Sequence, residues 1–344
     1  MKFPYLDFEP AIAEPAAFAP SAVVAGRTTV GPGLVLREYA TLRADGEAIR
    51  VGANGYFGQR ATVHIADAVY PSIMGDGVTV GRFGLVHACT IGDGVVVADG
   101  ATVMDGAVVG AHALIMPESV VPPRKILAGG IVYAGSPAVP VRAIDRDELA
   151  RFHAALRAGG PLEPHSLADL PPLLHPASVS GTAHPMRHPA TFVAPTAALA
   201  GRVEMAEDAA IYFACVVDAG DARIALGART NVQDNTLLVT DARRGDLVIG
   251  DDVTIGHNVR MGSGTVGNRA LVGMGAIVGD HVVVEDGACI GAGAHVEPGT
   301  RVPAGWIYAG RPARPFRELR PAERDGFADI IAVYAHYSEV YRGA

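Results

Sequence analysis

Hydrophobic positions recur about every six residues along most of the chain. In each unit one aliphatic residue precedes Gly or Ala, as in Val30-Gly31, Val51-Gly52, Val80-Gly81, Ile91-Gly92 and Val109-Gly110. This hexapeptide period is a signature of a β-helix, in which one aliphatic side chain per unit points inward and small residues occupy the turns. A β-sandwich would show alternating positions and more widely spaced turns. The pattern therefore predicts an all-β solenoid, whose coils bury a continuous apolar column and are stable only together.

The whole pattern occurs twice, at a constant offset of 175 residues. Ala19-Pro20-Ser21-Ala22 matches Ala194-Pro195-Thr196-Ala197 near the start of each copy. Near the end of each copy, Tyr133-Ala134-Gly135-Ser136-Pro137-Ala138 matches Tyr308-Ala309-Gly310-Arg311-Pro312-Ala313. The chain is therefore read as a tandem duplication of one solenoid.

Each copy is expected to end in an α-helix. Residues 144–156 form an amphipathic pattern that closes at Gly159-Gly160, and a longer helix is expected over 321–342. The chain then divides into four predicted segments: a loosely attached N-terminal arm (1–16), a first solenoid with its helix (17–158), a linker rich in Pro, His and Ser (159–190), and a second solenoid with its helix (191–344).

Composition narrows the class of protein. The net charge of −8 gives no reason to expect nucleic acid or an anionic membrane as a partner. The three scattered cysteines, Cys89, Cys215 and Cys289, indicate buried reduced thiols and not a disulfide framework. A leader segment and an apolar run long enough to cross a bilayer are both absent from the sequence. A cytoplasmic protein acting on a small molecule is the expectation.

Three histidines are divided between the two copies. His64 and His87 belong to the first copy, where the second has Val239 and Gly262. His257 belongs to the second copy, where the first has Arg82. Each histidine missing from one copy is thus present in the other.

These residues resemble the γ-class carbonic anhydrases and their relatives, left-handed β-helix proteins of the hexapeptide superfamily. The resemblance runs from about residue 17 to the C-terminus. Besides the late Tyr-Ala-Gly-x-Pro-Ala turn, the motifs that carry it are Arg43-x-Asp45, Thr230-Asn231-Val232-Gln233-Asp234 and Gly256-His257. It implies two left-handed parallel β-helix domains, each closed by a C-terminal α-helix.

The resemblance also implies a metal site. In that family the ion lies between neighbouring β-helices of a trimer, with two histidines from one subunit and the third from the next. Carried over, the ligands are His64, His87 and His257, holding Zn²⁺ or Fe²⁺, and the chain is expected to form a homo-oligomer such as a trimer. Three neutral imidazoles suit either ion and leave positions open for water.

Further positions follow the same division between copies. The family's Arg and Asp match Arg43 and Asp45 in the first copy only, and its Gln and Asp match Gln233 and Asp234 in the second copy only. Together with the three histidines, this predicts one composite site between first-copy and second-copy solenoids, with the reciprocal interface degenerate.

The resemblance implies a role for each of these other residues. Gln233 would orient water or substrate, and Arg43 would pair with Asp234. Asp67 stands where the family has a proton-shuttling Glu.

Several other residues are interpreted as structural and not as part of the site. Arg82 and Arg260 are read as solvated residues, Cys89 as a buried thiol, and His112, His281 and His295 as surface or turn residues. Tyr133 or Tyr308 is considered as a residue that reaches the cavity.

The leading hypothesis is a metal-dependent lyase or hydratase that activates water for attack on CO2 or a small metabolite. One alternative is a hexapeptide acyltransferase that uses a histidine as base and an acyl-CoA. Another is a metal-free assembly or binding subunit, in which the histidines are leftovers.

Overall fold

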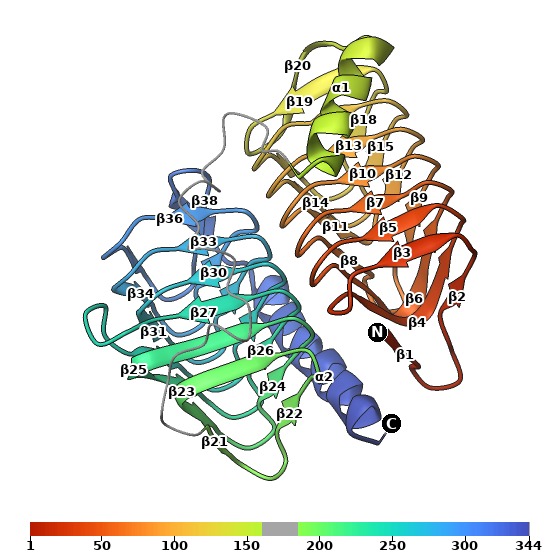
Figure 1. Cartoon of the computed structure of the whole chain (residues 1–344). Helices are drawn as coiled ribbons and strands as arrows, with labels where there is room; N and C mark the ends of the chain where they lie inside the picture. Colours follow the sequence, from red (N-terminus) through yellow and green to blue (C-terminus); the bar gives the residue numbers. More distant parts are fainter. Residues whose placement is uncertain (160–184, 344) are drawn as a thin grey trace. The chain divides into compact units, whose positions relative to one another are not determined.

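The computed structural model describes residues 1–159 and 185–343. These described residues divide into two compact units, called here the first lobe (residues 1–159) and the second lobe (residues 185–343). Each lobe is a left-handed parallel β-helix with one α-helix following its coils, as Figure 1 shows for each lobe by itself. The predicted fold class is confirmed.

Two sheets form the first lobe. One has twelve strands: β1 (Lys2–Phe3), β2 (Ala11–Ile12), β4 (Val23–Val30), β6 (Thr41–Val51), β8 (Thr62–His64), β9 (Ser72–Met74), β11 (Leu85–His87), β12 (Thr90–Ile91), β14 (Thr102–Val103), β15 (Val108–Val109), β17 (Val120–Val121) and β18 (Ile126–Leu127). The other has eight: β3 (Ala16–Phe18), β5 (Leu34–Leu36), β7 (Tyr56–Phe57), β10 (Thr79–Val80), β13 (Val96–Val97), β16 (Leu114–Ile115), β19 (Ile131–Ala134) and β20 (Val139–Ala143).

The second lobe repeats this plan. Its eleven-stranded sheet holds β21 (Met186–Arg187), β23 (Ala198–Met205), β25 (Val216–Leu226), β27 (Leu237–Val239), β28 (Leu247–Ile249), β30 (Arg260–Met261), β31 (Gly264–Val266), β33 (Ile277–Val278), β34 (Val282–Val284), β36 (His295–Val296) and β37 (Arg301–Val302). Its eight-stranded sheet holds β22 (Phe192–Val193), β24 (Ala210–Ile211), β26 (Asn231–Val232), β29 (Thr254–Ile255), β32 (Leu271–Val272), β35 (Cys289–Ile290), β38 (Trp306–Ala309) and β39 (Arg314–Glu318).

The six-residue period of the sequence corresponds to the spacing of the turns at the corners of the coils. Residues in the left-handed region of backbone space follow one another at six-residue steps: Gly94, Gly100, Gly106, His112, Glu118, Arg124 and Gly130. Glycine adopts this conformation without steric cost, which explains its frequency there. His112 and His281 both have positive φ, so both are turn residues, as predicted.

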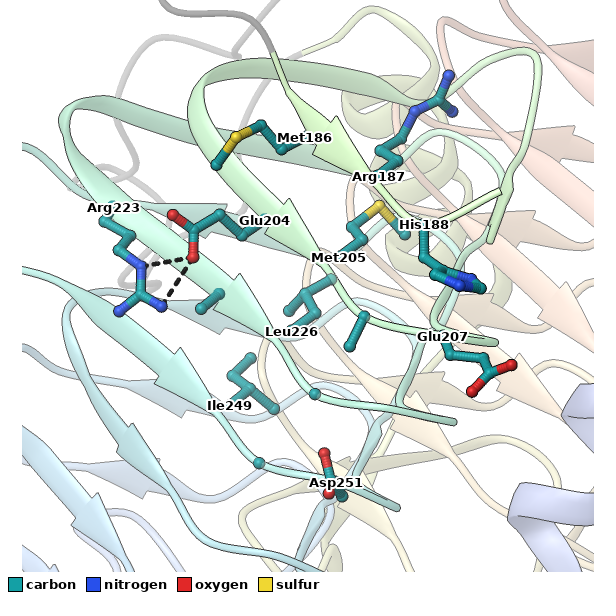
Figure 2. Close-up of a pocket in the computed structure, with 14 residues that line it drawn as sticks. Met186, Arg187, His188, Glu204, Met205, Glu207, Arg223, Leu226, Ile249 and Asp251 are labelled. Atoms are coloured by element: carbon teal, nitrogen blue, oxygen red, sulfur yellow. Dashed lines mark hydrogen bonds and ion pairs between the residues drawn. The ribbon is translucent and has the colours of Figure 1, made fainter. Parts of the chain in front are cut away.

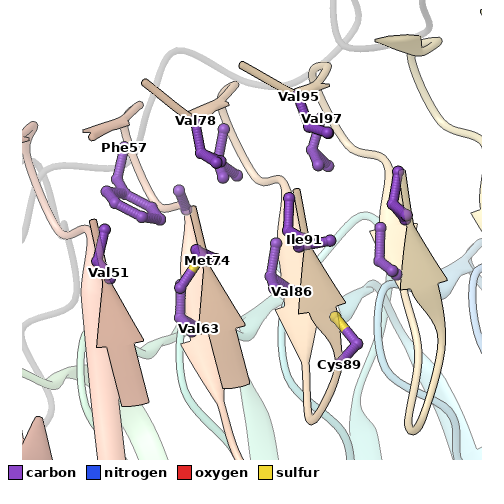
Figure 3. Packing of buried hydrophobic residues seen from close by; sticks show 14 of the residues in the cluster. Val51, Phe57, Val63, Met74, Val78, Val86, Cys89, Ile91, Val95 and Val97 are labelled. Atoms are coloured by element: carbon purple, nitrogen blue, oxygen red, sulfur yellow. The ribbon is translucent and has the colours of Figure 1, made fainter. Parts of the chain in front are cut away.

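The core is the expected column of aliphatic side chains. Val80 pairs with Val97 and Val97 with Ile115 on successive coils, and all three are fully buried. Figure 3 shows how such side chains stack along the inside of the first lobe. Burying one Val or Ile contributes about 1.5–3 kcal/mol, so the column supplies most of the stabilisation of each lobe.

Helix α1 (Arg146–Arg157) lies on the first lobe. Asp145 caps it by accepting a hydrogen bond from the Glu148 amide at 2.7 Å. Leu149 and Leu156 are buried in a cluster with residues of β13, β16 and β19. Helix α2 (Pro321–Gly343) packs on β22, β24, β26 and β29 of the second lobe. Both helices lie where the sequence predicted them.

The segment at the start of the chain is more closely attached than expected. Within the predicted arm 1–16, β1 and β2 both pair in parallel with β4, and β3, which begins at the last residue of this arm, pairs with β5. Main-chain hydrogen bonding to an otherwise exposed sheet edge explains the attachment.

At the other predicted boundary, β21 pairs with β23, so the end of the predicted linker 159–190 already forms sheet. Residues 160–184 of that linker lie outside the described residues, and the segment boundaries stay a prediction. Over the described ranges, no helix is long and apolar enough to cross a membrane.

Candidate metal centre

His64 and His87 end two neighbouring strands of the first lobe. β8 and β11 run in parallel, and His64 is the direct partner of His87 in their register. Residues in register on adjacent strands project to the same side, so the two rings lie together. His64 Nδ1 is 3.3 Å from His87 Nε2, and both side chains are buried.

That nitrogen–nitrogen distance has chemical meaning. Two imidazole nitrogens bound to one zinc ion at about 2.0–2.1 Å in tetrahedral geometry are about 3.3 Å apart. The same distance also fits a hydrogen bond when one of the two nitrogens carries a proton. The pair is therefore suited to hold a proton or an ion between its members.

Carboxylates stand behind both rings. Asp105 Oδ1 is 2.5 Å from His87 Nδ1, and Asp45 Oδ2 is 3.9 Å from His64 Nε2. In its turn Asp45, on β6, forms an ion pair with the fully buried Arg43. A carboxylate on one ring nitrogen fixes the ring and leaves the other nitrogen for a metal. Asp105 does this for His87 and leaves its Nε2 for a metal. At 3.9 Å, Asp45 is beyond hydrogen-bond distance of His64 Nε2 and acts on that ring through its charge.

His257 lies in the second lobe, at the corner between β29 and β30. Its Nδ1 is 3.2 Å from Asp234 Oδ2, and its Nε2 is 3.0 Å from the Tyr334 hydroxyl on α2. Asp234 is fixed by the Phe213 amide, which donates to Oδ1 at 3.0 Å. His257 is completely buried. Each of the three histidines thus has a carboxylate oxygen within 4 Å of one ring nitrogen, at 2.5 Å for His87, 3.2 Å for His257 and 3.9 Å for His64, while their gathering around one ion stays a prediction.

Gln233 belongs to a side-chain relay of the second lobe. Its Nε2 donates to Asn231 Oδ1 at 3.2 Å, and Asn231 Nδ2 donates to Thr254 Oγ1 at 3.0 Å. The relay fixes which end of the Gln233 amide is tied to its neighbour, so the carbonyl oxygen points away from Asn231. The predicted pairing of Arg43 with Asp234 stays a prediction, since each has the in-lobe partner given above.

Asp67 is placed differently from the other predicted site residues. It is exposed, in the tight turn that follows β8, with positive φ. Its carbonyl accepts a hydrogen bond from the Glu47 amide at 2.9 Å, which holds the turn against the neighbouring coil. Its role in proton transfer stays a prediction.

Two residues that contact these histidines were not predicted from the sequence. Asp105 follows His87 by 18 residues, which is three hexapeptides and therefore one coil, so counting coils would have placed it beside that ring. No sequence signal indicated Tyr334, because the contact depends on how far α2 extends along the coils.

The interpretation of Arg82 and Arg260 as solvated residues was wrong for Arg260, whereas the Arg82 side chain is 29% exposed and also ion-paired. Arg82 donates to Asp99 Oδ2 from Nε at 3.1 Å and from Nη2 at 2.7 Å, because the carboxylate lies one coil away. Arg260 is buried, since it stands in the sheet on β30.

The structure also bears on two other side chains. Burial, and then the carboxylate of Asp105, raise the pKa of the Cys89 thiol, so this thiol stays protonated as expected. The Tyr133 hydroxyl donates to the Ala128 carbonyl at 3.1 Å, which gives this buried tyrosine a structural partner.

A pocket of about 690 Å³ lies on the second lobe beside β21, β23 and β25 (Figure 2). Its lining includes the ion pair between Arg223 and Glu204. The small residues Ala225, Gly227 and Gly250 also line the pocket and fill little of its space. No predicted site residue is among the described residues that line it.

The sequence of the chain was compared with those of known proteins. No family model matches the chain. The chain is 40% identical over 154 residues to "Gamma carbonic anhydrase 3, mitochondrial" of Arabidopsis thaliana, covering 43% of this chain and 60% of that protein. It is 35% identical over 153 residues to "Protein YrdA" of Escherichia coli, covering 43% of this chain and 83% of that protein.

A solved structure gives a similar result. The hexapeptide transferase family protein of Anaplasma phagocytophilum is 36% identical, with a TM-score of 0.44, over 46% of this chain and 92% of that chain. The chain spans 60% of the length of the first Arabidopsis relative, and 54% and 53% of two further γ-carbonic anhydrases from that plant.

Proposed function

Because this chain belongs to the γ-carbonic anhydrase-like family, we propose that it is a metal-dependent lyase or hydratase with one composite metal site. The ligands are His64 and His87 from a first lobe and His257 from a second lobe. The substrate is CO2 or a small metabolite with an electrophilic carbon.

The observation that carries the proposal is the pairing of His64 with His87. Their facing nitrogens are 3.3 Å apart, the spacing expected for two ligands of one ion. The rings are buried, and Asp105 and Asp45 each stand behind one of them. A surface or turn histidine would need none of these features.

The third ligand is supported by complementarity. The second lobe has Val239 and Gly262 where the first has its two histidines, and it alone carries His257. His257 is again buried and again has a carboxylate, Asp234, on one nitrogen. Two decaying copies of a site would be expected to lose some positions in both, whereas here every position persists in one copy.

The residues fit Zn²⁺ or Fe²⁺. Neutral imidazole suits both ions, and three such ligands leave a position open for water. When bound, the ion would lower the pKa of that water to about 7 and so supply hydroxide at neutral pH. The Gln233 carbonyl would accept a hydrogen bond from the attacking water or the substrate. Asp67 would pass the released proton to solvent.

Metal content and activity test the proposal. The metal per chain is measured by elemental analysis on wild-type protein purified without chelators, and on His64→Ala, His257→Ala and Arg82→Ala. We expect about one zinc or iron per chain, lost in both histidine variants. Arg82→Ala is the matched control, because Arg82 holds the position of His257 in the other lobe. A wild type that binds no metal after reconstitution with zinc or anaerobic iron would refute the proposal.

Activity separates the proposal from its alternatives. CO2 hydration is followed by stopped-flow with a pH indicator on the metal-loaded protein, and then with small hydratable metabolites. Turnover of acyl-CoA by metal-free protein would favour the acyltransferase alternative instead. An unchanged cellular role of His64→Ala and His257→Ala would favour the assembly subunit. We also propose that the chain is a homo-oligomer, and sedimentation velocity measures its mass against the 35.5 kDa of one chain.

A further inference from the structure

The Tyr334 hydroxyl contacts Nε2 of His257, the ring nitrogen that does not face Asp234 and is therefore the one left for a metal. Asp234 Oδ2 is 3.2 Å from Nδ1, and the negative charge of an ionised carboxylate favours the ring proton on that nitrogen. With the proton on Nδ1, Nε2 has the lone pair, and the Tyr334 hydroxyl, whose oxygen is 3.0 Å away, would donate to it. One lone pair serves one partner at a time.

The distances make the two partners mutually exclusive. A zinc ion lies about 2.0–2.1 Å from a histidine nitrogen, along the direction of the lone pair. A hydroxyl oxygen 3.0 Å from Nε2 along that direction would be only about 1 Å from the ion. Tyr334 must therefore leave this position when an ion binds.

Tyr334 is held firmly where it stands. The Tyr212 hydroxyl donates to the Tyr334 main-chain carbonyl at 2.5 Å, and the two rings meet edge to face at 5.1 Å. The ring of Tyr337, one turn further along α2, also packs on the Tyr334 ring, with the ring centroids 5.4 Å apart. The hydroxyl is thus directed at His257 by packing that would hold a phenylalanine ring equally well.

The contact is specific to the lobe that carries His257. At the offset of 175 residues, Tyr334 corresponds to Gly159, just beyond the end of α1 at Arg157. His257 corresponds to Arg82, which pairs with Asp99. The hydroxyl and the histidine therefore occur together in one lobe, and neither has its equivalent in the other.

We propose that Tyr334 is a positioning residue that hydrogen-bonds to the metal-binding nitrogen of His257 and competes with the metal for it. In the metal-free protein it holds the ring in the Nδ1–H tautomer, and an ion displaces it. Metal occupancy is thereby coupled to the packing of α2. This inference rests on the proposed function, since it needs His257 to be a metal ligand.

Zinc affinity is the test. Metal-free wild type, Tyr334→Phe and the control Tyr341→Phe are titrated with zinc against a chromogenic chelator. We expect Tyr334→Phe to bind zinc about five- to tenfold more tightly, because a hydrogen bond no longer has to be broken. Tyr341, two turns along α2 from Tyr334, packs on Phe192 and Phe213, and its variant should bind like the wild type.

A second readout is the near-ultraviolet difference spectrum on adding zinc. It should show a perturbed tyrosine in wild type and Tyr341→Phe but not in Tyr334→Phe. Equal or weaker zinc binding by Tyr334→Phe would overturn the inference and leave the proposed function standing. Failure of all three proteins to bind zinc would overturn both. Thermal unfolding of each variant reports whether its fold is intact.

Discussion

Replacing Asp105 by Asn should weaken metal binding without changing any ligand. The carboxylate lies 2.5 Å from His87 Nδ1, the geometry of a charge-assisted hydrogen bond. The amide keeps the shape but loses the charge, so the ring becomes a weaker base and is less firmly oriented. Losing such a partner typically costs 10- to 100-fold in metal affinity, or about 1.4–2.8 kcal/mol.

The structure sets the expected value within that range. The Asp105 side chain is 36% exposed, so solvent screens part of its charge, and we expect a loss of about tenfold. The assay is competition between metal-free protein and a chelator of known zinc affinity.

The second lobe offers a matched control for this substitution. Asp280 holds the position of Asp105 there, and it contacts Arg244 and Ser263. Asp280→Asn should bind zinc like the wild type. An unchanged zinc affinity in a folded Asp105→Asn protein would refute the assignment of His87 as a ligand oriented by this carboxylate.

Two predictions concern the scaffold. Burial lowers the pKa of His153, which bonds Thr79 and Gly94 from α1, below its ordinary 6.5. The unfolded chain thus binds this proton first, and the stability gained above pH 6.5 is lost as pH falls through the folded-state pKa. Thermal melts from pH 7.5 to 5 should fall more steeply for wild type than for His153→Gln, and parallel curves would contradict this. Gly26→Ala should cost more than 2 kcal/mol, because φ is +65° and the new methyl group meets the Ala44 carbonyl. Gly77→Ala, with φ +68° but open space, should cost only about 1–2 kcal/mol in urea unfolding, and equal costs would refute the clash.

The repeated parts of this protein were predictable because their structure depends on short local sequence patterns. The aliphatic position in each hexapeptide predicts the buried column, as Val80, Val97 and Ile115 show. The pattern that closes at Gly159-Gly160 placed α1. A solenoid makes such inferences reliable because each coil contacts only its neighbours.

Contacts between distant segments were less predictable. Tyr334 is 77 residues from His257, and no local pattern shows which face of α2 meets that corner. The attachment of β1 to β4 was missed for a related reason. β1 is too short to show a pattern of hydrophobic and polar residues, and it pairs through main-chain groups. The pairing of Arg82 with Asp99 could have been predicted only by counting the residues of one coil between them.

The most direct test of the central claim is a count of the imidazole ligands on the bound ion. X-ray absorption at the zinc edge of the wild-type protein, loaded with one zinc per chain, gives the number and type of the ligand atoms. A composite site should give three imidazole nitrogens at about 2.0–2.1 Å, two from His64 and His87 and one from His257, and no sulfur. Two or fewer imidazoles, or a sulfur ligand, would contradict a site composed from both kinds of lobe.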